Sequence, residues 1–209
     1  MNIRKGNGAA SRLPAGPPIN IEHSAHKLTP MQRRFRFIAS VVDPRAWVHL
    51  LKLVNYYNYA HLRPRRQMKV GPDCEFSPTA TFAYGERIEL GARVVIGENT
   101  RLWAGPERAR ILVGDDTIIG PNVLITAANY RFDDGAPIHQ QRIDAADIVI
   151  GSDVWIGGGA IIMAGRSVGD GAVIGAGAVV TQNIPSLSIA VGVPARPISR
   201  RDTTSWQNQ

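Results

Sequence analysis

The chain has 209 residues, 24 Lys and Arg against 17 Asp and Glu, and a single cysteine, Cys74. One cysteine excludes an internal disulfide framework and is typical of a reducing compartment, so we expect a cytoplasmic protein. No apolar run is long enough to span a bilayer, and "MNIRKGNGAASRLPAGPPIN" lacks the apolar core of a signal peptide, so we expect neither feature.

The positive charge is concentrated near the N-terminus. Residues 1–70 hold 13 Lys and Arg against 2 Asp and Glu, whereas the other 139 residues hold 11 against 15. A nucleic-acid enzyme more often carries its basic surface on the folded domain, so this distribution argues against a nucleic-acid partner. It is compatible with an anionic surface, such as a membrane or a phosphorylated lipid-linked substrate.

Two segments precede the main body of the chain. Residues 1–29 are rich in Gly, Pro, Asn and Ser and predict a flexible basic tail. Residues 30–69 predict two short amphipathic helices, because Thr29-Pro30 and Asp43-Pro44 are both helix-start signals. Apolar residues follow at helical spacing: Phe35, Ile38 and Val42, then Trp47, Leu50, Leu51 and Val54. These helices could lie peripherally on a membrane surface, or pack on the body or on a second subunit.

From Val70 onward, aliphatic residues recur at every sixth position within three blocks, 90–102, 113–125 and 150–180. The series comprises Leu90, Ile96, Leu102, Val113, Ile119, Ile125, Ile150, Ile156, Ile162, Val168, Ile174 and Val180. Most of these residues are followed at once by glycine, and the fifth position of each hexad is usually small or β-branched. A period of six fits neither a helix nor a simple amphipathic strand, but it fits a short strand followed by a tight corner. Three such units close one coil, and stacked coils bury the aliphatic residues, which predicts a solenoid.

This pattern resembles the hexapeptide-repeat transferases. The resemblance covers residues 70–198 and implies an all-β solenoid, a left-handed parallel β-helix, with an inserted loop at 130–147 and a C-terminal tail at 199–209. The stretch "IVIGSDVWIGGGAIIMAGRSVGDGAVIGAGAVVTQNIPSLSIAVGVPARPI" is similar to the sugar and polysaccharide O-acetyltransferases, near the maltose and nodulation-sugar enzymes. It implies a homotrimer that transfers acetyl from acetyl-CoA to a sugar hydroxyl without a metal.

The donor site that this resemblance implies is a groove with a floor of small residues. Grouping the hexads by threes, with coils that start at 113, 144 and 162, places Ala127, Gly158 and Ala176 in one column. Such a floor lets a long thin ligand lie against the backbone. The resemblance assigns coenzyme contacts to Gly158, Ala176, Thr181, Gln182 and Arg196. Gln182 departs from the lysine of many relatives, and Arg196 could equally be an ordinary surface cation.

The repeat stops at "ITAANYRFDDGAPIHQQ", which resembles the loop that builds the acceptor site. The resemblance implies Asn129 followed by a histidine that acts as general base, but Tyr130 stands at that position. Three interpretations remain open. His139 supplies the base; Tyr130, or Asp133 and Asp134, replaces it, although an unperturbed tyrosine is a poor base; or the site is impaired.

The sequence bears on three other classes of function. A catalytically impaired module that binds a sugar or a protein partner is favoured by Tyr130. A zinc enzyme of the same fold needs three imidazoles around the metal, whereas the repeat region offers only His139. A nucleotidyltransferase needs a separate α/β domain, for which the chain has no room.

Overall fold

The computed structural model describes residues 29–202 and divides into two units, residues 1–47 and 48–209. The predicted tail at 1–29 therefore lies, except for Thr29, outside the described residues. In the first unit, helix α1 (Pro30–Val42) begins at Thr29, whose hydroxyl accepts a hydrogen bond from the amide of Gln32. In turn, the Thr29 amide donates a hydrogen bond to the side-chain Oε1 of Gln32 at 2.9 Å, which completes a capping box.

Helix α2 (Pro44–Tyr57) continues directly into two further helical turns. The π-helical turn η1 (Asn58–Leu62) and the short helix α3 (Arg63–Gln67) follow without a break. All of these turns lie within residues 30–69, where the sequence predicted two helices; the structure adds that the second helical segment includes a π-helical turn and runs on to Gln67. Helices α1 and α2 bury none of their residues, and no helix among residues 29–202 is both long and apolar enough to cross a membrane.

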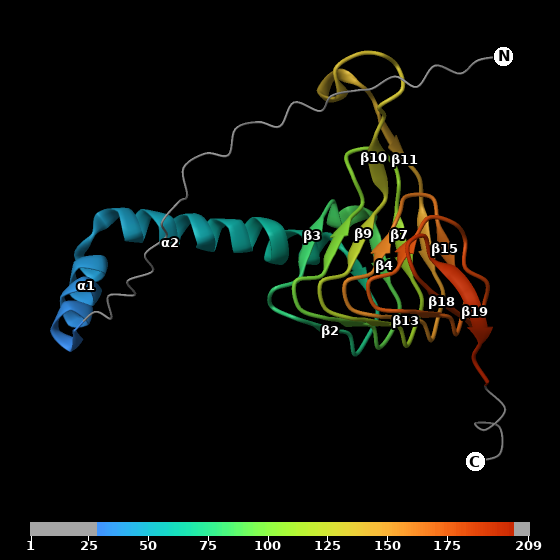
Figure 1. The fold of residues 1–209 in the computed structure, drawn as a ribbon, viewed down its shortest axis with the longest axis horizontal. Coiled ribbons are helices and arrows are strands. Elements are labelled where there is room, and N and C mark those ends of the chain that lie inside the picture. The colour runs from blue at the N-terminus through green and yellow to red at the C-terminus, as the bar shows by residue number, and fades with distance from the viewer. Residues whose placement is uncertain (1–28, 203–209) are drawn as a thin grey trace, which may run out of the picture. The chain divides into compact units, whose positions relative to one another are not determined.

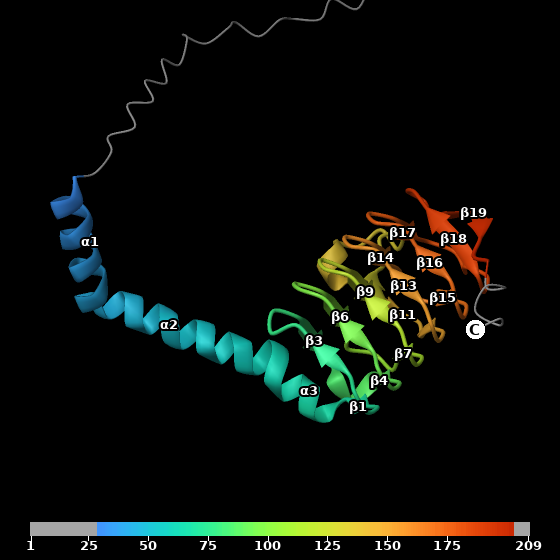
Figure 2. The same cartoon turned by 90° about the horizontal axis from the view of Figure 1, so that it is seen from below.

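The body of the second unit is a left-handed parallel β-helix with three sheets (Figures 1 and 2). Sheet A contains β1 (Lys69–Val70), β4 (Ile88–Leu90), β7 (Ile111–Val113), β12 (Ile148–Ile150) and β15 (Ser167–Val168). Sheet B contains β2 (Glu75–Phe76), β5 (Val95–Ile96), β8 (Ile118–Ile119), β13 (Trp155–Ile156), β16 (Val173–Ile174), β18 (Ser188–Val191) and β19 (Arg196–Arg200). Sheet C contains β3 (Thr81–Ala83), β6 (Arg101–Trp103), β9 (Leu124–Thr126), β14 (Ile161–Ile162) and β17 (Val179–Val180).

The chain visits the sheets in the order A, B, C, so each set of three strands is one coil. Coil 1 begins at β1, coil 2 at β4, coil 3 at β7, coil 4 at β12 and coil 5 at β15. Strand β18 adds a partial sixth coil on sheet B, and β19 pairs antiparallel with β18. The last strand thus extends to Arg200, two residues past the predicted end of the solenoid.

The six-residue series forms the core, as predicted. All twelve aliphatic residues of the series are buried, with at most 5% of each side chain exposed. The fifth-position residues also point inward; Val94, Thr100 and Ala172 are among those with 0% exposure. Register explains the stacking, because Ile156 pairs with Ile119 on one neighbouring coil and with Ile174 on the other. Each fully buried aliphatic side chain contributes about 1.5–3 kcal/mol of transfer free energy.

Glycine follows these residues because the next coil passes very close to the corner. A Cβ placed on Gly157 would lie 2.6 Å from the backbone nitrogen of Ala176, closer than atoms in contact can approach. The recurrent aliphatic-glycine pair therefore records the spacing of about 5 Å between coils.

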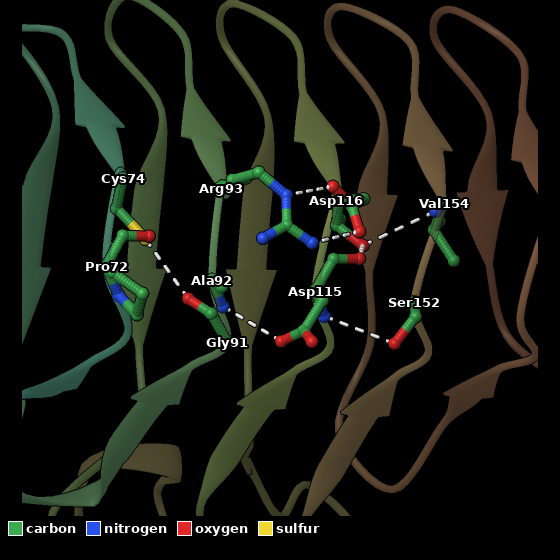
Figure 3. Close-up of polar contacts among 10 residues, drawn as sticks. Pro72, Cys74, Gly91, Ala92, Arg93, Asp115, Asp116, Ser152 and Val154 are labelled. Carbon is green, nitrogen blue, oxygen red and sulfur yellow. Dashed lines mark hydrogen bonds and ion pairs between the residues drawn. The ribbon is translucent and has the colours of Figure 1, made fainter.

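Side chains also bind backbone groups of the adjacent coil along the corner between sheets A and B (Figure 3). The Asp115 carboxylate accepts a hydrogen bond from the Ala92 amide at 2.8 Å, and the Asp115 amide donates to the Ser152 hydroxyl at 3.2 Å. Cys74 is half-buried, and its thiol donates to the Gly91 carbonyl at 3.1 Å. The cysteine therefore packs in the repeat as a small residue, and these contacts bind each coil to the next.

Candidate functional site

The candidate donor site lies around β14 and β17, the last two strands of sheet C. Gly158 belongs to the corner that precedes β14, and Ala176 belongs to the matching corner before β17. Ile156 and Ile174 are register partners, so the residues two positions later share one column. The amide of Gly177 donates to the Gly158 carbonyl at 2.9 Å, which holds the two corners together.

The predicted place of Ala127 in this column is wrong. Ile125 pairs with Ile162, which pairs with Val180, so Ala127 shares its column with Ala164 and Gln182. The error has a physical cause: residues 143–145 belong to a hairpin, so coil 4 begins at β12, six residues later than the grouping by threes assumed. The column of Gly158 and Ala176 continues instead to Pro121.

Thr181 and Gln182 follow β17 at the corner between sheets C and A. Thr181 is exposed and Gln182 is half-buried, and neither side chain forms a hydrogen bond with residues 29–202. They border the same strand as Ala176 but lie at its opposite end. The predicted coenzyme contacts therefore enclose β17 rather than forming a single column.

Arg196 reaches the same strand from the partial sixth coil. The amide of Val179 donates to the Gly192 carbonyl at 3.0 Å, and the Ala195 amide donates back to the Val179 carbonyl at 2.8 Å. Residues 192–195 thus run along the free edge of β17, with a cis peptide bond between Val193 and Pro194. Arg196 follows immediately, is exposed, and donates through Nη1 to the Ala195 carbonyl at 2.9 Å.

The break in the repeat is an antiparallel hairpin that projects from the coils (Figure 1). Strand β10 (Ala128–Tyr130) pairs with β11 (Ile143–Ala145), so that Asn129 lies opposite Asp144 and Tyr130 opposite Ile143. The hairpin leaves the solenoid after β9 and rejoins it before β12. Its base is held by the Ala146 amide, which donates to the Ala127 carbonyl at 3.0 Å.

Gln141 organises the hairpin loop, a role that the sequence analysis missed. Only 7% of Gln141 is exposed, and its Nε2 donates to the Ala136 carbonyl at 2.6 Å. Arg131 Nε adds an ion pair to Asp144 Oδ2 at 3.2 Å across the hairpin. A glutamine in an otherwise exposed polar loop carries no distinctive signal in the sequence, because its burial depends on how the loop folds back.

The candidate bases differ in their surroundings. His139 lies in the 3₁₀ turn η3 (Ile138–Gln140), is exposed, and its Nε2 lies 3.3 Å from the side-chain Nε2 of Gln140. Tyr130 is 55% exposed, and Asp133 lies 3.9 Å from Arg131. Asp134 Oδ1 accepts from the Ala136 amide at 2.9 Å, so this carboxylate helps to shape the loop.

The structure does not bring the base candidates and the donor residues together within one chain. No hydrogen bond or ion pair among residues 29–202 joins the loop at 130–142 to Gly158, Ala176, Thr181, Gln182 or Arg196. Residues 29–202 also contain no cluster of three or more His, Cys, Asp or Glu side chains that could hold a metal ion.

Comparison with known proteins agrees with this architecture. The family model "Bacterial transferase hexapeptide (six repeats)" matches residues 147–182. Nodulation protein L of Rhizobium meliloti is 38% identical over 128 residues, which are 61% of this chain and 68% of that protein. The chain belongs to the hexapeptide-repeat transferase family. Within that family, the polysialic acid O-acetyltransferase of Escherichia coli O1:K1 is 41% identical over 119 residues, 53% of this chain.

A solved hexapeptide-repeat structure supports the same fold. An acetyltransferase of Vibrio cholerae in complex with acetyl coenzyme A superposes with a TM-score of 0.60 at 26% identity, over 72% of this chain and 84% of that one. The chain spans only 37% of the length of the polysialic acid enzyme, so the likeness extends to only part of that protein.

Proposed function

We propose that the protein is an acetyl-CoA-dependent O-acetyltransferase that acetylates a sugar hydroxyl of a glycan, polysaccharide or glycolipid precursor. The main support is the corner of small residues, Gly158 and Ala176, beside the terminal strands of sheet C. It occurs in a chain whose relatives include a polysialic acid O-acetyltransferase, and whose fold is shared with an acetyltransferase that binds acetyl coenzyme A.

The donor would lie along β17. A Cβ on Gly158 would lie 3.2 Å from the Pro121 carbonyl, and a Cβ on Gly177 would meet nothing within 4 Å, so this corner combines tight packing with open space. A pantetheine arm is long and thin and can pass over such a surface. Thr181 offers a hydroxyl, and Arg196 offers a guanidinium group suited to a phosphate of the coenzyme.

The proposed reaction is direct transfer. The acceptor hydroxyl oxygen attacks the thioester carbonyl carbon, a C–O bond forms, the C–S bond breaks, and coenzyme A leaves as the thiol. The base removes the hydroxyl proton and returns a proton to the departing sulfur, so no metal is needed. An imidazole suits this task because its pKa lies near the working pH.

We propose His139 as this base, with Tyr130 as the alternative and Asn129 as a residue that positions the acceptor. The donor residues cluster around β17, whereas His139 projects on the hairpin, so the proposed site is completed between two subunits. Incubation with acetyl-CoA and a panel of sugars, with free thiol as the readout, tests the activity. Release above background with one acceptor supports the enzyme; no release with any acceptor contradicts it.

A catalytically impaired sugar- or partner-binding module is the second candidate. The observation in its favour is Tyr130 at the position where the base is expected, together with the exposure of His139. Equilibrium binding of the same sugars without thiol release would support this candidate.

We also propose a homotrimer. The outer face of sheet B presents Trp155 and its register partner Ile118, 55% and 49% exposed, which suits them to a subunit contact. Light scattering should give three times the chain mass of 22.7 kDa. Trp155→Arg should lower that mass, whereas an unchanged mass would remove Trp155 from the interface.

Finally, we propose that the N-terminal helices bind an anionic membrane surface, so that the enzyme works at the inner face of the membrane on lipid-linked substrates. Residues 29–67 carry eight Lys and Arg against one Asp. Helix α1 places Met31, Phe35, Ile38 and Val42 on one side, and these side chains are 59% to 82% exposed. A basic amphipathic helix of this kind lies in the plane of the headgroups.

Vesicle sedimentation tests the membrane contact. The protein should bind vesicles containing phosphatidylglycerol and not vesicles of phosphatidylcholine alone, and Phe35→Ser should weaken binding. Phe132→Ser is the matched control, because Phe132 is also exposed, 82% against 74% for Phe35, but lies on the hairpin. Equal binding to both vesicle types, or unchanged binding by Phe35→Ser, would contradict the proposal and favour packing on a second subunit.

A further inference from the structure

A cavity of about 500 Å³ lies at the N-terminal end of the solenoid, away from β17. One wall is the C-terminal part of α2 with η1, and the other is formed by the corners and sheet C strands of coils 1 and 2. All of its lining residues belong to the second unit. Its polar lining side chains include Tyr56, Tyr57, His61, Thr81, Asn99 and Arg101.

His61 is the buried polar group of this cavity. Only 3% of the residue is exposed, because the π-helical turn η1 directs it against the solenoid. Its Nδ1 lies 2.7 Å from the Ala80 carbonyl, so Nδ1 carries the hydrogen and donates. The ring stacks on Tyr57 with centroids 5.0 Å apart, which fixes its orientation. Nε2 makes no hydrogen bond with residues 29–202 and remains available.

Among the other polar groups of the cavity, the Thr79 hydroxyl accepts a hydrogen bond from the Asn99 backbone amide at 2.9 Å, but three more side chains are uncommitted. The side chains of Asn99 and Arg101 form no hydrogen bond or ion pair with residues 29–202, and neither does the hydroxyl of Thr81. The cavity lining contains no carboxylate, so the charge of Arg101 is not neutralised there. Two tyrosine rings provide flat, amphipathic surfaces beside these groups.

This combination indicates a ligand chemistry. A guanidinium without a carboxylate partner recognises phosphate or carboxylate. An imidazole nitrogen, an amide and hydroxyls recognise a body rich in hydroxyl groups, and aromatic rings cover its apolar face. π-Helical turns, such as the one that carries His61, occur often at functional sites.

We infer that this cavity binds a monosaccharide that carries an anionic substituent, with Arg101 holding the anion and His61 Nε2 holding a hydroxyl. The inference concerns binding and stands whether or not the chain transfers acetyl groups. If the proposed function holds, the inference extends it by naming an anionic sugar as the ligand class, for example a unit of the acceptor.

The test is calorimetric binding to the full chain without acetyl-CoA. Hexose 1-phosphates of the gluco, galacto and manno configurations and glucuronate are compared with glucose and with inorganic phosphate. At least one anionic sugar should bind, and at least tenfold more tightly than either glucose or phosphate. The phosphorylated sugars and glucuronate separate a phosphate from a carboxylate as the anion.

Arg101→Gln should weaken binding of the anionic sugar by roughly ten- to a hundredfold, because it removes a charged hydrogen-bond donor. Arg93→Gln is the matched control, since it removes the same charge from an exposed arginine outside the cavity and should leave binding unchanged. Tyr56→Leu should weaken binding while it keeps an apolar side chain in the wall.

Three results would overturn the inference. They are no binding by any anionic sugar, equal binding of inorganic phosphate, or an Arg101→Gln variant that binds as tightly as the original chain. The calorimetric test contains no acetyl-CoA, so an inactive acetyltransferase would not produce any of these three results. Conversely, these three results would not change the outcome of the thiol-release assay, so the two proposals can fail independently.

Discussion

The coils and the hairpin at 128–145 differ in how their apolar side chains are buried. In the coils, aliphatic side chains such as Ile156 are fully buried between neighbours of the same kind. In the hairpin, Phe132 and Ile138 are 82% and 57% exposed, and a few side-chain contacts such as that of Gln141 hold the loop. The coils supply rigidity, and the hairpin presents side chains from that rigid support.

The largest expected effect tests whether the hairpin carries chemistry. His139→Ala should lower kcat by about a hundred- to ten-thousandfold, the usual contribution of a general base, with little change in the free energy of unfolding. Thiol release and denaturant unfolding measure the two quantities. A loss of rate in Tyr130→Phe with full activity in His139→Ala would assign the base to Tyr130 instead.

A core substitution tests where stability resides. Ile156→Ala should lower the free energy of unfolding by about 2–5 kcal/mol, because it opens a cavity between three coils. The matched change in the hairpin, Ile138→Ala, should alter it by no more than about 0.5 kcal/mol, since that side chain is exposed. Urea unfolding followed by circular dichroism compares them. Equal losses would mean that the hairpin is part of the core.

Two glycines sharpen the contrast between packing and backbone conformation. Gly157→Ala should cost about 1–3 kcal/mol, because its Cβ would meet the backbone of Ala176 at 2.6 Å. Gly135 in the loop has φ of +81° with nothing within 4 Å of its Cβ position, so Gly135→Ala should cost about 1 kcal/mol from conformation alone. Thermal unfolding distinguishes the variants, and a harmless Gly157→Ala would contradict the close approach of the coils.

The smallest expected effect concerns a solvent-exposed ion pair between adjacent coils. Arg93 Nη2 lies 2.7 Å from Asp116 Oδ2, and its hydrogen bond holds the pKa of Asp116 below the ordinary value of 3.8 (Figure 3). A lowered folded-state pKa adds stability above the unfolded-state pKa, and this stability is lost as the pH falls through the folded value. Arg93→Gln should raise the pKa of Asp116 toward its ordinary value, as measured by NMR titration. An unchanged titration would show that the pair does not form in solution.

The coils could be predicted in detail because the same positions of the six-residue repeat are buried in successive coils. Ile150, Ile156 and Ile162 all occupy the core, and Gly158 lies over Ala176 as the spacing indicated. The hairpin interrupts that count. Ala127 was assigned to the wrong column because nothing local distinguishes residues 143–145, which pair antiparallel, from the first strand of a coil.

In the N-terminal region, too, local features could be predicted from the sequence and long-range contacts could not. Helix α1 could be predicted from Thr29 and Pro30 because caps are local signals. The cavity around His61 could not, since His61 and Ala80 are 19 residues apart and meet only because a π-helical turn is followed by the first coil.

The amino-acid sequence by itself determined the three-sided coil, its buried aliphatic residues and the point at which the repeat stops, because each of these depends on contacts that recur every six residues or every turn. Only the tertiary structure decided which corners align across the insertion, how Gln141 shapes the loop, and which groups enclose the cavity beside Arg101. Those contacts join segments that are far apart along the chain, and no local spacing encodes them.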